Sequence, residues 1–127
     1  MLQIRGEIQM NLEIDSQRRY QQFLSRTIQT NEVWGLVNKD GWCVCPSNDF
    51  LDTDVMLFWS DRAYANQCAI EEWSNYTPQE IPLTEFIDQW LTGMNEDGLM
   101  VGLNWNVQLI GLELEPLKVK ADFELKL

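Results

Sequence analysis

The chain has 127 residues, a length that predicts one domain large enough to bury its own core. Its 45% hydrophobic content and six tryptophans indicate a folded chain rather than a disordered one. The formal net charge of -11 argues against nucleic-acid binding, which depends chiefly on Lys and Arg. The lack of histidine excludes His-based catalytic triads and every zinc site that needs imidazole.

The sequence shows no sign of membrane insertion or export. Its longest apolar runs are far shorter than the roughly 20 residues that span a bilayer. The N-terminus lacks the basic and then apolar pattern of a signal peptide. We therefore expect a cytoplasmic protein without membrane contact, in which the three cysteines stay reduced.

The first segment of the domain is predicted to be a helix. We expect residues 1–14 to be an N-terminal extension or lead-in and residues 15–127 to form the domain. Asp15 or Ser16 can cap the helix by accepting an amide hydrogen bond of its first turn. The expected buried face follows helical spacing and consists of Tyr20, Phe23, Leu24, Thr27 and Ile28.

Residues 33–59 carry strand and turn signals. Residues 33–37 and 42–45 are predicted to pair as strands across a turn that contains Asp40-Gly41. Pro46 ends the second strand, because proline cannot donate to a sheet. An acidic loop follows, and the apolar run 55–59 is predicted to be a central strand.

The next segment is predicted to be a short helix that starts at Ser60 or Asp61. Its inner side is small, with Ala65, Cys68 and Ala69, so that it can lie close to a sheet. Residues 75–80 are predicted to be a loop.

Residues 84–95 carry the clearest helical pattern in the chain. Thr84 is the predicted cap, and Gly98 follows the helix, where a positive φ is needed. The apolar stripe consists of Phe86, Ile87, Trp90, Leu91 and Met94. Because this stripe is broad, we expect it to pack on the sheet.

The C-terminal part is predicted to hold two strands and a helix. Residues 99–105 and 107–114 have strand character and would form a hairpin that turns near 104–106. Residues 117–127 are predicted to be a helix with Leu117, Ala121 and Leu125 facing inward. Together the elements predict an α+β domain with an antiparallel sheet of about five strands and three to four helices, packed mainly on one face.

Negative charge is concentrated in the middle of the chain. Residues 31–115 hold fifteen acids against Lys39 and Arg62, whereas both ends carry a slight positive excess. A field of this sign attracts basic partners and speeds their encounter. Asp49, Asp52 and Asp54 cluster in one loop and are the residues we expect in an interaction surface.

The same residues allow other chemistry, which the patterns support less. The aspartate loop could hold calcium, although it lacks the spacing of a calcium-binding loop. Cys43, Cys45 and Cys68 could act in redox chemistry or hold a metal, but packing is the commoner role of free cysteine. We predict no cofactor and no metal, and no converging set of side chains indicates an enzyme.

The leading functional hypothesis is a non-enzymatic protein whose acidic surface binds a basic protein, as an immunity protein or antitoxin does. The alternative is a small-molecule-binding or regulatory domain with a tryptophan-lined pocket, because six tryptophans are many for this length. An enzyme that uses carboxylates or a thiol is a third reading.

Several local patterns together resemble one family. They are Arg19-Tyr20-x-x-Phe23-Leu24, Val33-Trp34-Gly35-Leu36, Gly41-Trp42, Trp59 with Tyr64-Ala65, Glu80-Ile-Pro-Leu-x-Glu-Phe-x-x-x-Trp90-Leu-x-Gly93, and Glu96-Asp97-Gly98-Leu99. The set resembles the domain-of-unknown-function family 2750, which consists of small uncharacterised bacterial proteins, over about residues 15–114. The resemblance implies a bacterial origin but no activity. Members of that family often have Pro-His after the tryptophan that matches Trp59, whereas this chain has Ser60-Asp61.

Overall fold

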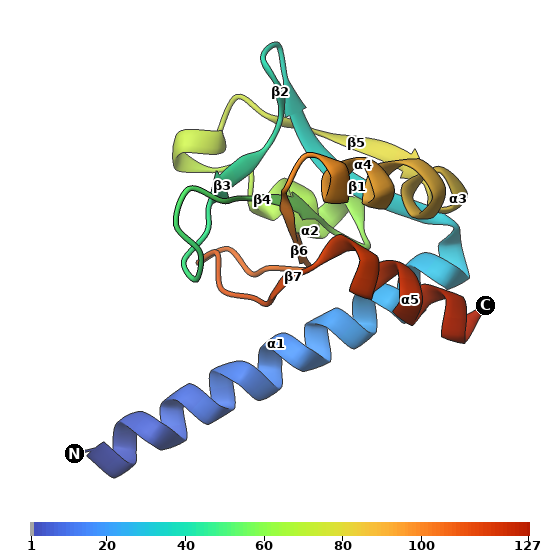
Figure 1. Cartoon of the computed structure of the whole chain (residues 1–127). Coiled ribbons are helices and arrows are strands. Elements are labelled where there is room, and N and C mark those ends of the chain that lie inside the picture. Colours follow the sequence, from blue (N-terminus) through green and yellow to red (C-terminus); the bar gives the residue numbers. More distant parts are fainter. Residues whose placement is uncertain (1) are drawn as a thin grey trace.

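The computed structural model describes residues 2–127, with side chains described from residue 11 onward. The helical elements are α1 (Leu2–Thr30), α2 (Arg62–Gln67), the 3-10 turn η1 (Glu71–Trp73), α3 (Leu83–Glu85), the π-helical turn η2 (Phe86–Trp90), α4 (Leu91–Glu96) and α5 (Pro116–Lys126). The strands are β1 (Glu32–Asn38), β2 (Gly41–Trp42), β3 (Val44–Pro46), β4 (Asp54–Phe58), β5 (Thr77–Pro82), β6 (Met100–Leu103) and β7 (Glu113–Leu114). The predicted α+β class is therefore confirmed (Figure 1).

The strands form two sheets, so the prediction of one sheet of about five antiparallel strands was wrong. The first sheet has the order β2-β1-β5 and the second has the order β3-β4-β6-β7, with β4 and β6 parallel. The predicted return strand divides at Cys43, because Trp42 pairs with Val37 in one sheet and Val44 pairs with Met56 in the other. Paired hydrogen bonds between Trp34 and Trp59 connect β1 to the end of β4, so the two sheets adjoin.

The strand β5 replaces the loop that was predicted over residues 75–80. Two prolines, Pro78 and Pro82, and several polar residues hide this strand in the sequence. Proline is tolerated here because β5 lies at a sheet edge, where one side of the strand needs no donor. Its other side pairs with β1 over six residues.

The helix α1 begins at Leu2, so the predicted start at Asp15 or Ser16 was wrong. Neither residue caps it: Asp15 is exposed and pairs with Arg18, and the buried Ser16 hydroxyl accepts a hydrogen bond from Arg19. Figure 1 shows the first half of α1 extending away from the rest of the chain. The predicted buried face is confirmed for Tyr20, Phe23, Leu24 and Thr27, and Ile28 is half-buried.

The predicted helix over residues 84–95 is confirmed as the continuous run α3, η2 and α4. It begins at Leu83 rather than at a Thr84 cap: Pro82 takes the N-cap position, and the Leu83 N–H donates to the Asn31 carbonyl at 3.1 Å. The wider π turn places Phe86 and Leu91, five residues apart, on the same buried side. Four of the five residues of the predicted apolar stripe are buried, and Trp90 is half-buried.

The C-terminal third differs most from the sequence prediction. The two predicted strands do pair antiparallel, but they are shorter than predicted: β6 ends at Leu103, only Glu113–Leu114 form β7, and residues 104–112 connect them in place of a tight turn near 104–106. The helix α5 is confirmed, but the three residues predicted to face inward, Leu117, Ala121 and Leu125, are all exposed, Leu125 at 87%. Val119 and Phe123 are buried instead.

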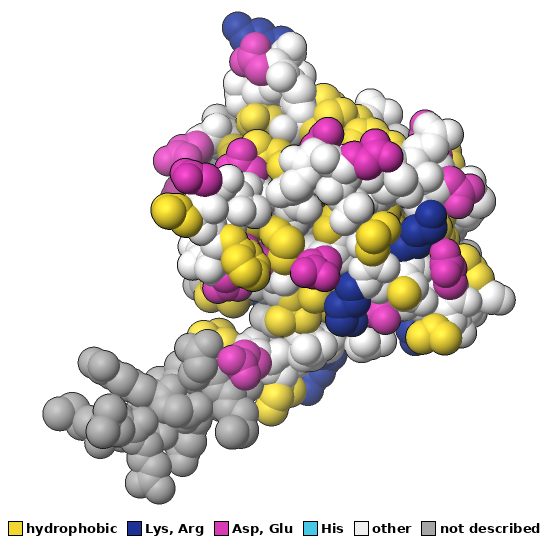
Figure 2. All heavy atoms as spheres, viewed as in Figure 1, with side chains coloured by type: hydrophobic (Ala, Val, Ile, Leu, Met, Phe, Trp, Pro, Cys, Tyr) yellow, Lys and Arg dark blue, Asp and Glu magenta, His cyan; other side chains and the backbone are white. Residues whose placement is uncertain are grey.

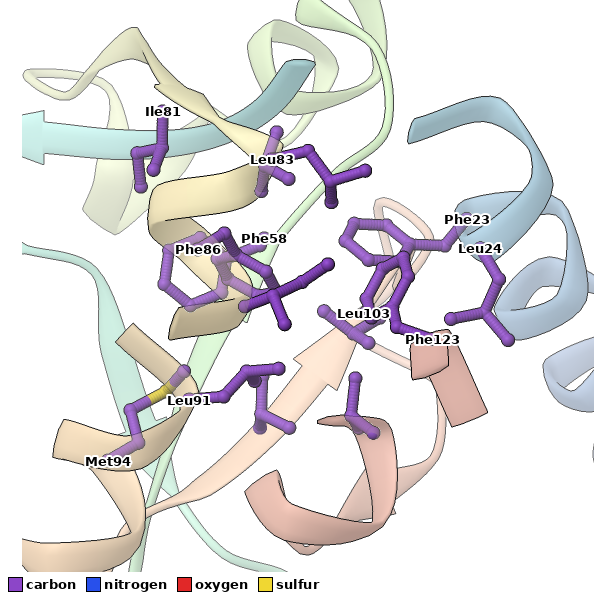
Figure 3. Packing of buried hydrophobic residues seen from close by; sticks show 14 of the residues in the cluster. Phe23, Leu24, Phe58, Ile81, Leu83, Phe86, Leu91, Met94, Leu103 and Phe123 are labelled. Atoms are coloured by element: carbon purple, nitrogen blue, oxygen red, sulfur yellow. The ribbon is translucent and has the colours of Figure 1, made fainter. Parts of the chain in front are cut away.

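Two hydrophobic clusters hold these elements together. The larger cluster joins α1, α5, the run α3–α4 and the strands β4, β5 and β6. In Figure 3, Phe23 from α1, Phe123 from α5 and Phe86 from η2 meet at its centre. The smaller cluster gathers Trp59, Trp105 and the three cysteines around α2. No helix among the described residues has both the length and the hydropathy to span a bilayer.

Candidate functional site

The three predicted interaction residues lie at one end of the β3–β4 hairpin. Asp49 and Asp52 belong to the connecting loop, and Asp54 starts β4 opposite Pro46. All three are exposed, and none forms an ion pair with another described residue. Asp52 has a φ of 55°, a left-handed conformation that aspartate and asparagine adopt more readily than most residues.

Hydrogen bonds to one serine and one distant glutamate hold this loop. The Ser47 hydroxyl oxygen accepts the backbone N–H groups of Asp49 and Phe50 at 3.0 and 2.9 Å. The same hydroxyl donates to Glu113 of β7, whose second carboxylate oxygen accepts the Asn48 N–H at 2.9 Å. The aspartates therefore sit on an anchored loop, and Glu113 adds a fourth negative charge. Sequence reasoning missed Glu113, because only the fold brings β7 to this loop.

Apolar side chains lie exposed among these acids. Phe50 and Leu51, at the tip of the loop, are 54% and 91% exposed. Beside β3 is a hollow of about 270 Å³ with exposed Val44 and Ile70 in its wall and the carboxylates of Glu71 and Glu72 next to them.

We call the set of acids around β3 the acidic surface. It comprises Asp49, Asp52, Asp54, Glu71, Glu72 and Glu113. Cys45 lies half-buried in the middle of β3. Burial raises the pKa of its thiol, and the negative charges of Glu113 and Asp54 raise that pKa further. In Figure 2 the left-hand side of the body, where β3 lies in Figure 1, carries several acidic side chains, and the Lys and Arg side chains in view lie elsewhere.

The thiols are neutral groups inside the smaller cluster. Burial raises the pKa of Cys43 to about 12 and that of Cys68 to about 11. A protonated thiol is a poor nucleophile and a poor metal ligand. Among the side chains described, no three Cys, Asp or Glu groups come together in a way that could hold a metal ion.

A second hollow, which we call the Arg19 cavity, lies between α1, α2 and the loop that follows β6. Its volume is about 290 Å³. The residues that line it are aromatic, amide-bearing or small, with one cation: Trp59, Tyr64, Trp105, Gln22, Gln67, Asn104, Asn106, Cys68, Val107 and Arg19. The six tryptophans therefore do not form one pocket, but two of them line this cavity.

Arg19 forms no ion pair among the described residues. Its Nε donates to the Asn104 carbonyl at 3.0 Å, and its Nη2 donates to the Ile110 carbonyl at 2.8 Å and to the Ser16 hydroxyl at 3.2 Å. All three acceptors are neutral. Arg26, seven residues along, differs in this respect, because it forms an ion pair with Asp61 at 3.1 Å.

A family model settles the relationship of the chain. The model described as "Protein of unknown function (DUF2750)" matches residues 20–123. The chain belongs to the DUF2750 family. The matched DUF2750 segment contains the whole acidic surface and all of the Arg19 cavity except Arg19 itself. No curated protein and no solved structure matches the chain. The family description carries no activity, so the function must be argued from the two surfaces.

Proposed function

We propose that this DUF2750 protein is a non-enzymatic binding protein whose acidic surface recognises a basic protein partner. The observation that carries the proposal is the lack of internal neutralisation. Residues 31–115, all of them described, hold fifteen acids, and only Asp61 among them forms an ion pair. Self-repulsion of this kind destabilises the folded chain, and a cationic partner relieves it.

The acidic surface also offers apolar contacts that a mere solubilising surface does not need. Leu51 and Phe50 project from a loop that is fixed by Ser47 and Glu113, so the loop loses little conformational freedom when a partner covers them. Leu51 and Phe50 supply apolar area, whereas the acids supply orientation and a faster encounter. The fitting partner is therefore a basic protein with apolar side chains among its Lys and Arg.

An immunity or antitoxin role is the concrete form of this proposal. A toxin that acts on nucleic acid carries a cationic face, because it must neutralise phosphates. An acidic protein that covers this face blocks access to the substrate. The acidic surface of this chain has the sign and the apolar content that such a cover requires.

The test is a pull-down from a lysate of the source organism, followed by calorimetry with the purified partner at increasing salt. The variant D49N/D52N/D54N removes three charges and keeps the side-chain shapes; asparagine also tolerates the left-handed backbone at Asp52. The control E80Q/E85Q/D88N removes three charges from a different part of the chain. We expect the first variant to weaken binding at least tenfold more than the control, with salt reducing wild-type affinity.

Two results would refute the proposal. One is that no protein partner is retained, or that the retained one elutes without regard to salt. The other is that both triple variants weaken binding equally, because binding would then depend on net charge rather than on the acidic surface.

A further inference from the structure

The Arg19 cavity contains a charge that nothing in the described structure neutralises. Arg19 is half-buried and forms no ion pair with a described residue, although the chain holds twenty acids. Its three hydrogen-bond acceptors are two carbonyls and a hydroxyl, and none of them carries a charge. No hydrogen bond to its Nη1 appears among the described residues. A partly desolvated guanidinium of this kind favours an anion beside it.

The remaining wall of the cavity suits a flat apolar group. The rings of Trp59 and Trp105 have both indole N–H groups occupied, by the Trp105 carbonyl at 3.0 Å and the Leu112 carbonyl at 2.8 Å. They therefore offer the cavity no free polar group, and because Trp59 is fully buried and Trp105 is 4% exposed, both rings lie at its base. Tyr64, which is 48% exposed, adds a third ring at the cavity wall. No Asp or Glu lines the cavity.

The cavity walls are preorganised. The Asn104 side chain accepts the Ser60 N–H at 2.8 Å and donates to the Arg19 carbonyl and the Ser60 hydroxyl. Arg19 in turn holds the backbone at Asn104 and Ile110. A ligand that enters such a cavity immobilises few side chains, which improves its affinity. The volume of about 290 Å³ matches the lower end of ligand pockets, roughly 300–1,000 Å³, and therefore a small metabolite.

We infer that the Arg19 cavity binds a small aromatic carboxylate. The carboxylate lies against the Arg19 guanidinium, and the flat ring lies against Tyr64 and Trp105, close above the buried Trp59. This site is separate from the acidic surface and does not depend on the proposed partner.

The experiment uses calorimetry on the full chain with indole-3-carboxylate as the probe and indole-3-carboxamide as its neutral match. In ¹⁵N-labelled protein, the indole N–H signals of Trp59 and Trp105 report where the probe binds. We expect the carboxylate to bind at least tenfold more tightly than the amide and to shift these two signals. Equal affinity for the two probes, shifts confined to other tryptophans, or no binding at about 5 mM would overturn the inference.

Paired variants test the charge directly. Arg19→Met should remove the preference for the carboxylate, whereas Arg18→Met, the loss of the same charge from an exposed neighbour, should leave it intact. If Arg19→Met does not fold, Gln67→Glu serves instead, because Gln67 is exposed and lines the cavity. The new negative charge should weaken carboxylate binding about tenfold. Gln89→Glu, outside the cavity, should have no effect; equal effects of the two glutamates would overturn the inference.

Discussion

Gly102 provides a sharp test of the packing around Trp105. It lies in β6, paired with Leu57 of β4 on one side and with Glu113 of β7 on the other. A Cβ added at Gly102 would lie 2.5 Å from Leu57 Cδ2 and 2.6 Å from Trp105 Nε1. Since carbon contacts are normally about 3.5–4.0 Å, Gly102→Ala requires movements of about 1 Å.

The neighbours of Gly102 have little room to move. Leu57 and Trp105 are buried, and Gly111 also lies close against the indole, since a Cβ added there would lie 2.1 Å from Trp105 Cδ1. Overpacking a core costs about 1–3 kcal/mol, and alanine returns about 0.5–1 kcal/mol by restricting the unfolded chain. We therefore expect Gly102→Ala to lower the free energy of unfolding by about 1–2 kcal/mol.

The assay is urea unfolding followed by circular dichroism, with Gly93→Ala as the matched control. Gly93 lies in α4, and an added Cβ would meet nothing within 4 Å. The same chemical change should stabilise there, by about 0.5–1 kcal/mol, because alanine is the better helix former. If the two variants shift stability in the same direction, or if Gly102→Ala has no effect, the described clamp on Trp105 is wrong.

Three further predictions concern buried polar groups. Tyr20→Phe removes the 2.6 Å hydrogen bond to Asp122 and should lower the free energy of unfolding by about 1 kcal/mol in urea titrations. At pH 8 a thiol-specific reagent should modify Cys45 in the native protein, and Cys43 and Cys68 only after unfolding, because both are buried. Burial raises the pKa values of Cys43 and Cys68 from about 9 to about 12 and 11. The two protonated thiols therefore contribute their full stabilisation below pH 9. The free energy of unfolding should fall as the pH rises from 9 toward 12, because the thiols of the unfolded chain ionise first. In Cys43→Ala/Cys68→Ala this decrease should be absent.

Local sequence signals were the ones from which structure could be predicted. The apolar stripe from Phe86 to Met94 predicts its helix, because residues at that spacing share one buried face only when the backbone is helical. The Asp40-Gly41 pair predicts the β1–β2 hairpin, because glycine accepts the positive φ that such a turn needs. In the structure Gly41 has a φ of 129° and β1 pairs with β2. Both signals are local, and both were confirmed.

The parts that depend on distant contacts could not be predicted in this way. The strand β5 owes its existence to β1, not to its own proline-containing sequence. Residues 104–112 have strand-like composition, yet they form a loop. Their backbone carbonyls accept hydrogen bonds from side chains instead of from a neighbouring strand: the Trp105 indole donates to Leu112, and Arg19 donates to Asn104 and Ile110. Of the acidic surface, the sequence indicated Asp49, Asp52 and Asp54, whereas Glu71, Glu72, Glu113 and the Arg19 cavity needed the fold.

The hollow beside β3 and the Arg19 cavity share a wall, yet we expect the acidic surface and the Arg19 cavity to act independently. Cys68 and Val107 line both hollows. Coupling between two sites needs an element that can adopt two arrangements. The shared wall is instead held in a single arrangement, because the Trp59 N–H and the Cys68 thiol both donate to the Trp105 carbonyl, at 3.0 and 3.8 Å. The charges of the aspartate loop are screened over about 8 Å at 0.15 M salt. D49N/D52N/D54N should therefore bind indole-3-carboxylate with the wild-type Kd, and a change beyond about threefold would show that the wall moves.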